Sequence, residues 1–152
     1  MKKIISLMLV GFLSIGFSSC SSDDGNASGT TSKKVREALL ASQWEIGSLI
    51  INEAGEPNQN LNDVYDDYRF TFSDPNTVTF ANASSQETTT FSIPEQASWS
   101  YGHLGFHLRF SETGEFAFLG QNWIIQKMVN NQIFLRFIDQ DGASGVMILN
   151  KI

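Results

Sequence analysis

The sequence is poor in the residues that build disulfide bonds and catalytic or metal sites. Its 152 residues include one cysteine, two histidines and three prolines. A single cysteine cannot form a disulfide within the chain, so stability has to come from the packing of side chains. Basic residues are also few, ten against sixteen acidic ones, which gives a formal charge of −6. Such an acidic surface argues against nucleic acid or anionic lipid as a partner.

Long apolar runs are missing as well. A membrane-spanning helix needs about 20 apolar residues, whereas the apolar stretch 4–17 is shorter and contains serines and glycines. It follows Lys2 and Lys3 and ends in small residues, which is the pattern of a secretory signal peptide. We therefore expect residues 1–19 to be removed as a signal peptide. The remaining 133 residues, with sixteen acidic and eight basic side chains, carry a formal charge of −8 and suit a single domain.

The single cysteine follows this segment directly. Ser18 and Ser19 lead into Cys20, and this run resembles the lipobox of bacterial lipoproteins, whose cysteine is lipidated and becomes the first mature residue. The alternative is an ordinary cleaved signal and a free cysteine, but lipidation accounts for an unpaired cysteine in a secreted chain. The next residues resemble the surface-export signal of Bacteroidota lipoproteins, which implies an outer-membrane protein, lipid-anchored and exposed at the cell surface. The expected export signal consists of Ser21, Ser22, Asp23 and Asp24.

A polar linker and one helical pattern follow. Residues 21–32 contain no apolar side chain larger than Ala27, so residues 20–32 are predicted to be the lipidated cysteine and a flexible tether. The stretch 33–42 has apolar residues, including Val35 and Leu39, at helical spacing, and Ser32 is expected to cap the helix that they predict.

From Gln43 onward the apolar residues recur every second position, which is the period of a β-strand. The polar stretch 52–67 is predicted to be a long loop, residues 97–101 carry Trp99, and Phe116 and Phe118 continue the alternation after a turn. About eight strands are predicted, at 43–51, 68–72, 78–80, 86–93, 104–110, 123–129, 133–138 and 146–149.

Turn signals recur every 8–12 residues along these strands, and no βαβ unit is present. This pattern predicts an all-β domain over residues 33–152, an antiparallel meander of about eight strands with one short N-terminal helix. A closed barrel is attractive because closure removes sheet edges. A β-sandwich is the alternative.

The order of several short motifs resembles the lipocalin-like lipoproteins of Bacteroidota over roughly residues 33–152. This resemblance implies a lipocalin-like β-barrel without catalytic activity. In lipocalins the first strand opens with Gly-x-Trp, and Ser42 stands here in the place of that glycine. The motifs are a helix running into Leu40-Ala41-Ser42-Gln43-Trp44, then Tyr68-x-Phe70-x-Phe72, Ser98-Trp99, residues 119–125 with Trp123, and Met147-Ile148-Leu149-Asn150-Lys151.

Residue patterns that indicate catalysis or metal binding are weak. His103 and His107 share the polar face of one predicted strand and lie about 13 Å apart on it, too far to bind one metal directly. We expect both to be solvated. Asp139-x-Asp141 is interpreted as part of a hairpin turn, because the further ligands of a calcium loop are missing. There is no Gly-x-Ser-x-Gly elbow, so we predict no enzyme, no metal site and no cofactor.

Aromatic residues on the apolar faces of the strands are the main candidates for a binding site. An eight-stranded barrel is just wide enough to be filled by side chains or to hold one small ligand. Both outcomes need large apolar residues facing inward, so the pattern leaves them open. The candidate ligand-lining residues are Trp44, Tyr68, Phe70, Phe72, Phe80, Phe106, Phe110 and Trp123.

Two functions are therefore favoured. In the first, a non-catalytic, lipid-anchored lipocalin-like protein binds a small apolar or amphipathic ligand inside the barrel. In the second, the core is filled and the protein is an interaction or structural accessory subunit of an outer-membrane complex, with an exposed aromatic patch around Trp99 and Tyr101. A hydrolase that uses His103 or His107 is the least favoured reading.

Overall fold

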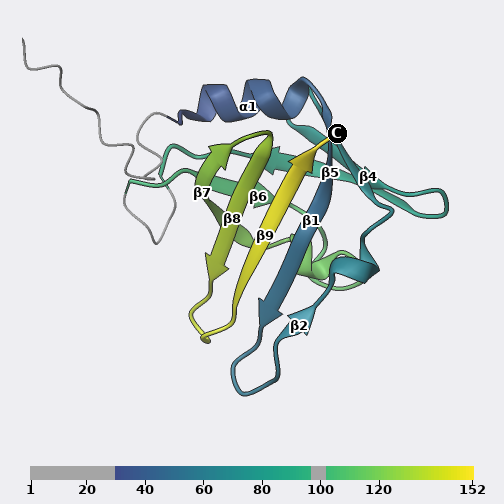
Figure 1. Ribbon diagram of the computed structural model, residues 1–152, viewed down its shortest axis with the longest axis vertical. Helices are drawn as coiled ribbons and strands as arrows, with labels where there is room; N and C mark the ends of the chain where they lie inside the picture. The colour runs from purple at the N-terminus through teal and green to yellow at the C-terminus, as the bar shows by residue number, and fades with distance from the viewer. Residues whose placement is uncertain (1–29, 97–101) are drawn as a thin grey trace, which may run out of the picture.

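Nine antiparallel strands and one α-helix make up the computed structural model, which describes residues 30–96 and 102–152 (Figure 1). The all-β prediction is confirmed, and so are the strand positions wherever apolar side chains alternate cleanly. The strands are β1 (Gln43–Asn52), β2 (Gln59–Asn60), β3 (Arg69–Ser73), β4 (Thr77–Ala81), β5 (Gln86–Ser92), β6 (Gly105–Leu108), β7 (Asn122–Val129), β8 (Gln132–Ile138) and β9 (Ser144–Lys151).

Pairing of the first long strand with the last one closes the sheet. Each strand from β3 to β8 pairs with the next, and β1 pairs with β2, β3 and β9. Eight residue pairs join β1 to β9, from Trp44↔Lys151 to Asn52↔Ser144. Figure 1 shows β7, β8, β9 and β1 in front of β4, β5 and β6, whose direction crosses theirs. The predicted antiparallel meander is thus a closed, barrel-like sheet with two facing halves.

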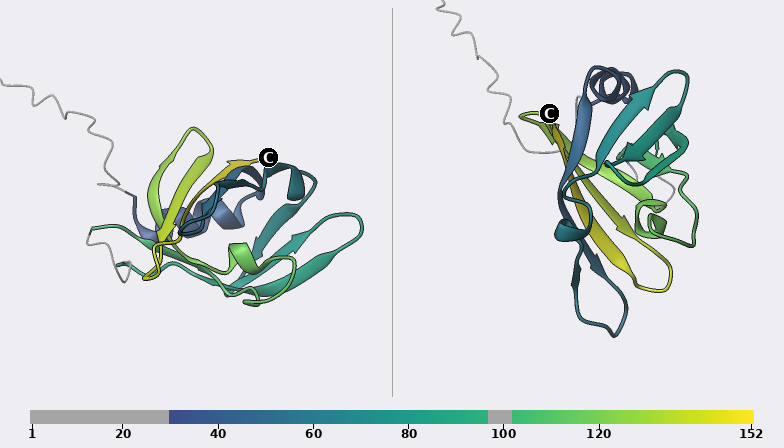
Figure 2. Two further views of the ribbon diagram at one scale, coloured as in Figure 1. Left: turned by 90° about the horizontal axis from the view of Figure 1, so that it is seen from below. Right: turned by 90° about the vertical axis from the view of Figure 1, so that its right-hand side faces the viewer.

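Helix α1 (Ser32–Leu40) covers one end of the closed sheet. It lies between the two halves, as the right-hand view of Figure 2 shows with the helix seen end-on. Two of its own side chains, Val35 and Leu39, are fully buried. The prediction that Ser32 caps the helix is wrong, because the Thr31 side chain accepts a hydrogen bond from the backbone N–H of Lys34 at 3.3 Å. Ser32 is the first helical residue.

Two further predictions need correction. The predicted loop 52–67 contains β2 and a 3₁₀ turn, η1 (Asn62–Val64), and its Tyr65 is buried. The region of Phe116 and Phe118 is a second 3₁₀ turn, η2 (Ala117–Leu119), instead of a strand. Both segments cross the second end of the sheet, the end that α1 does not cover. Backbone groups there form hydrogen bonds within short turns, and single aromatic side chains are buried. Residues 97–101, with the predicted patch around Trp99, lie outside the described residues.

The core is built around the side chain of Phe80, which is fully buried. Its ring centroid lies 4.1 Å from that of Phe70 and 4.8 Å from that of Tyr68, in stacked arrangements. It also lies 5.3 Å from that of Phe116, edge to face. Aromatic pairs in such geometries contribute about 0.5–1.5 kcal/mol each beyond their buried area. Phe80 therefore joins the central strands to the segment that covers the second end.

Replacing Phe80 with alanine should lower the free energy of unfolding by about 3–5 kcal/mol, because a large cavity would remain among rings that cannot collapse onto it. Urea unfolding followed by tryptophan fluorescence measures this loss. Thr90→Ala, at an exposed site on β5, is the control and should change stability by no more than about 0.5 kcal/mol. A Phe80→Ala loss as small as that of the control would contradict the packing described here.

Candidate functional site

The structure brings all eight candidate ligand-lining residues into one interior. Each is at most 5% exposed. They come from strands far apart in the sequence, from the residue just before β3 and from the loop that follows β6. The inward set consists of Trp44, Tyr68, Phe70, Phe72, Phe80, Phe106, Phe110 and Trp123.

Within this interior the aromatic side chains pack against one another. The Phe72 ring centroid lies 5.9 Å from that of Phe70 and 6.2 Å from that of Phe106. The indole N–H groups are also used internally. Trp44 donates to the carbonyl of Leu39 in α1 at 3.3 Å, and Trp123 donates to the carbonyl of Leu119 at 3.0 Å. The two tryptophans thereby tie the sheet to the segments that cover its two ends.

The second end is closed by Phe116 and its neighbour Glu115. The ring centroid of Phe116 lies 5.4 Å from that of Tyr68 and 6.4 Å from that of Tyr65. Tyr65 donates a hydrogen bond to the carbonyl of Glu115 at 2.6 Å. The Glu115 carboxylate accepts hydrogen bonds from the Tyr68 hydroxyl and, at 3.2 Å, from Ser85. These contacts hold the loop that carries Phe116 against the sheet.

This hydrogen-bonding also affects ionisation. Burial is the main cause that raises the pKa of Tyr65, and the hydrogen bond to the Glu115 carboxylate is the main cause that raises the pKa of Tyr68. Both phenols therefore remain neutral donors well above physiological pH. Sequence reasoning missed Tyr65 and Phe116, although the Tyr-x-x-Tyr spacing of Tyr65 and Tyr68 at the end of a polar loop was a usable signal.

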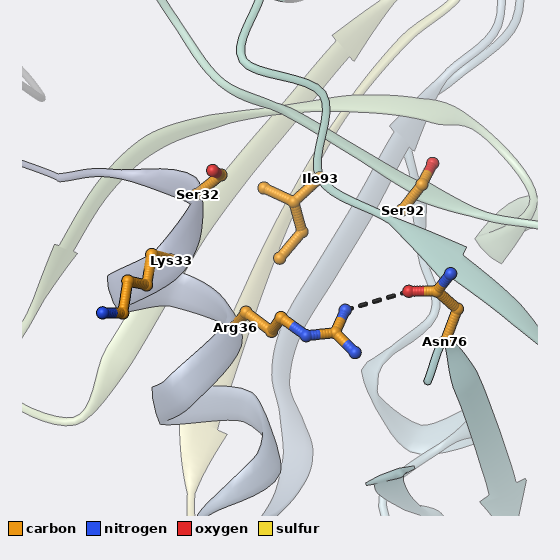
Figure 3. A pocket seen from close by; sticks show the side chains of 6 residues that line it. All are labelled: Ser32, Lys33, Arg36, Asn76, Ser92 and Ile93. Carbon is orange, nitrogen blue, oxygen red and sulfur yellow. Dashed lines mark hydrogen bonds between the residues drawn. The ribbon is translucent and has the colours of Figure 1, made fainter. Parts of the chain in front are cut away.

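At the first end, a hollow of about 380 Å³ lies in the seam between α1 and the sheet (Figure 3). Its polar margin is dominated by Arg36, which donates to the Asn76 side chain at 2.9 Å and pairs with Asp74 at 2.5 Å. The Arg36 guanidinium also lies 5.4 Å from the ring centroid of Phe91. Because the Arg36 guanidinium is engaged in these contacts, it holds α1 against the β3–β4 turn. The hollow is lined by Ser32, Lys33, Arg36, Asn76, Ser92 and Ile93.

The two histidines are intermediate in burial, so the prediction that both are solvated holds only for part of their surface. Pro94 lies beside Gly105 where the pairing of β5 with β6 continues, because the Gly105 N–H donates to the Pro94 carbonyl at 2.9 Å. The Pro94 side chain lies 2.5 Å from the place that a Cβ on Gly105 would take, and Nε2 of His107 lies 3.3 Å from the same place. Burial lowers the pKa of His107, and the neighbouring positive charge of Arg109 lowers it further.

The Asp139-x-Asp141 pattern has a structural role. The Asp139 carboxylate accepts backbone hydrogen bonds from Asp141 at 3.0 Å and Ala143 at 2.8 Å, which builds the predicted hairpin turn between β8 and β9. In the described part of the chain, no three His, Cys, Asp or Glu side chains come together in a way that would hold a metal ion.

The expected membrane anchor, Cys20, and the expected export signal, Ser21 to Asp24, fall outside the described residues. Within residues 30–96 and 102–152 there is no helix with the length and apolar character that a bilayer crossing requires.

Comparison with known proteins adds no assignment. No protein family, no curated protein and no solved structure matches this chain.

The lowered pKa of His107 predicts a pH dependence of stability. Below the ordinary histidine pKa of about 6.5 the unfolded chain binds a proton that the folded chain resists. The contribution of His107 is therefore complete above that pH and is lost as the pH falls through the folded-state pKa. Urea unfolding near pH 7.5 and pH 5 should show a smaller acid-induced loss of stability in His107→Gln than in the unsubstituted protein. Equal losses in the two proteins would contradict the burial of this ring.

Proposed function

We propose that this protein is a lipid-anchored outer-membrane protein that makes and breaks no bonds, and that it acts as an interaction module built on a packed β scaffold. One observation carries the proposal. The aromatic residues that could line a ligand cavity fill the interior by packing on one another, and both ends of the sheet are covered. A solid scaffold leaves its outer surface as the place for binding.

The anchor rests on the sequence around Cys20. A lipobox-like run directly before the only cysteine accounts for that residue, and each acyl methylene buried in a bilayer contributes about 0.8 kcal/mol. Several acyl chains on one residue hold a protein stably at a membrane. The acidic residues that follow support display at the cell surface through their resemblance to the Bacteroidota export signal.

The absence of catalysis is supported by the surroundings of His107. Its ring contacts Arg109, whose Nη2 lies 3.4 Å from Nδ1. A general base of a hydrolase needs a nucleophile on one ring nitrogen and an orienting acid on the other. A cation beside the ring instead disfavours the protonated histidine that such a mechanism forms.

Lipidation can be tested in the bacterium that produces the protein. Cells fed radiolabelled palmitate should incorporate label into the wild-type chain and not into Cys20→Ala. The substituted chain should also leave the membrane fraction. Labelling that persists in Cys20→Ala, or a wild-type chain that takes up no label, would overturn the proposed anchor.

A second candidate, binding of a small apolar ligand inside the sheet, is favoured by one observation. Helix α1 buries only Val35 and Leu39 completely, and the hollow at its seam opens beside Ile93. Displacement of α1 would expose the aromatic interior from this end. Because the interior of the folded state is packed, the interaction module is the first choice.

An apolar fluorescent dye, N-phenyl-1-naphthylamine, separates the two candidates. The mature chain from residue 20, carrying Cys20→Ser, should show no saturable dye binding, because its interior is occupied. Phe116→Ala in the same chain should leave a void of about one phenyl ring, which is too small for this three-ring dye, so this variant should not bind it either. Saturable one-to-one binding by the chain with Phe116 intact would favour the interior-ligand function instead.

A further inference from the structure

The outer face of β7, β8 and β9 differs from the rest of the described surface. Strand alternation directs one set of side chains inward, and the other set forms continuous rows across the strands. One row runs from Ile50 on β1 through Val146 to Arg136, and the next runs from Ile148 through Phe134 to Lys127. We call these six residues the basic–apolar face. Val146 at its centre is 44% exposed.

This face concentrates apolar surface. Val64, Val129, Ile138, Val146 and Ile152 are the large hydrophobic residues that are exposed in the described part of the chain, and three of them lie on β7, β8 and β9. Among the three, Val146 belongs to the basic–apolar face, where Ile50, Phe134 and Ile148 add partly exposed apolar surface. Isolated exposed apolar residues are ordinary, whereas apolar surface gathered on one face is typical of an interaction site.

The same three strands carry only positive charge. The sequences of β7, β8 and β9 contain no Asp or Glu, although the whole chain has sixteen. Lys127 and Arg136 form no ion pair among the described residues, whereas Arg36 and Arg69 are each paired with a carboxylate. Lys127 instead places its Nζ 4.3 Å from the ring centroid of Phe134. Two cations are thus presented beside apolar side chains in an otherwise acidic protein.

A bulge interrupts the strand pairing under this face. The pairing register of β7 with β8 shifts between Ile125 and Lys127, so Gln126 has no direct partner. Such bulges bend a strand and redirect its side chains. A hollow of about 320 Å³ lies at this point, and it is lined by Gln126, Lys127, Phe134, Leu135, Arg136 and Val146.

The geometry points to a docking site for an acidic protein segment that carries a large apolar side chain. That side chain enters the hollow against Phe134 and Val146, and flanking carboxylates pair with Lys127 and Arg136. Arginine suits this role because its guanidinium binds a carboxylate through two parallel hydrogen bonds. Buried aromatic and arginine residues also dominate the energetics of many interfaces.

A short segment fits this face better than an anionic lipid surface does. An extended anionic surface would meet the field of the whole chain, whose formal charge is −6. A segment seated on the two cations is shielded from distant carboxylates, since charges are screened over about 8 Å at physiological salt. The inference names the partner of the interaction module and rests on that proposed function.

Fluorescence anisotropy with a defined probe tests the docking site. The probe is a fluorescein-labelled peptide of alternating Glu and Leu with one central Phe, and a second peptide with Lys in place of Glu is its charge control. The mature chain carrying Cys20→Ser should bind the acidic peptide, with an affinity that falls as salt is raised, and should not bind the Lys peptide. Arg136→Glu and Phe134→Ser should each weaken binding at least about tenfold.

Arg109→Glu makes the same charge change at an exposed site off this face and should leave the affinity unchanged. Unchanged thermal unfolding of the variants shows that they fold. Failure of the acidic peptide to bind, equal binding by Arg136→Glu, or binding of the Lys peptide would overturn the docking site.

Vesicles of phosphatidylglycerol provide the lipid arm. Sedimentation of the Cys20→Ser chain with them that is abolished by Arg136→Glu would also overturn the proposal and assign the face to lipid. A chain that is palmitoylated and excludes the dye but ignores the peptide refutes this docking site alone. A chain that takes up no palmitate refutes the proposed function whatever the peptide does.

Discussion

Pairing of β1 with β9 is the constraint on which the rest of the structure depends. It joins residues about a hundred positions apart in one ladder, and the closed sheet has one interior. Two glycines permit the close approach. A Cβ on Gly47 would lie 2.3 Å from the Asn150 side chain, and one on Gly145 would lie 2.8 Å from the Ile51 side chain. Small side chains at both positions let the strands of the closing ladder pack without displacing their neighbours.

Closure also decides where the buried aromatic side chains meet. Once the sheet is closed, its inward-facing apolar residues share one interior, where aromatic ring centroids lie as close as 4.1 Å. Trp44 and Trp123 then join the filled sheet to the segments at its ends. The outer side is different, since alternation leaves Phe134 and Val146 there beside two cations. A packed core and the basic–apolar face on which we propose docking are thus two results of one strand pattern.

Strand alternation made most of this fold predictable. Phe70 and Phe72 face inward as their spacing indicates, because the period of two residues is a local property of the backbone. Tyr65 and Phe116 were not predictable in this way, since each is positioned by partners some fifty residues away, such as the Glu115 carbonyl that Tyr65 contacts. The bulge after Ile125 was not predictable either, because it depends on the pairing of β7 with β8. A cavity lining and a packed core need identical inward residues, so sequence alone left that choice open.

The sheet closes through β1 and β9 around a packed aromatic core. A nuclear Overhauser spectrum of the isotope-labelled mature chain tests this closure. Backbone cross-peaks are expected between Leu49 and Met147, which the closing ladder pairs, together with cross-peaks between the rings of Phe80 and Phe116. A folded protein that shows neither set, with β1 and β9 as free edges, would contradict it.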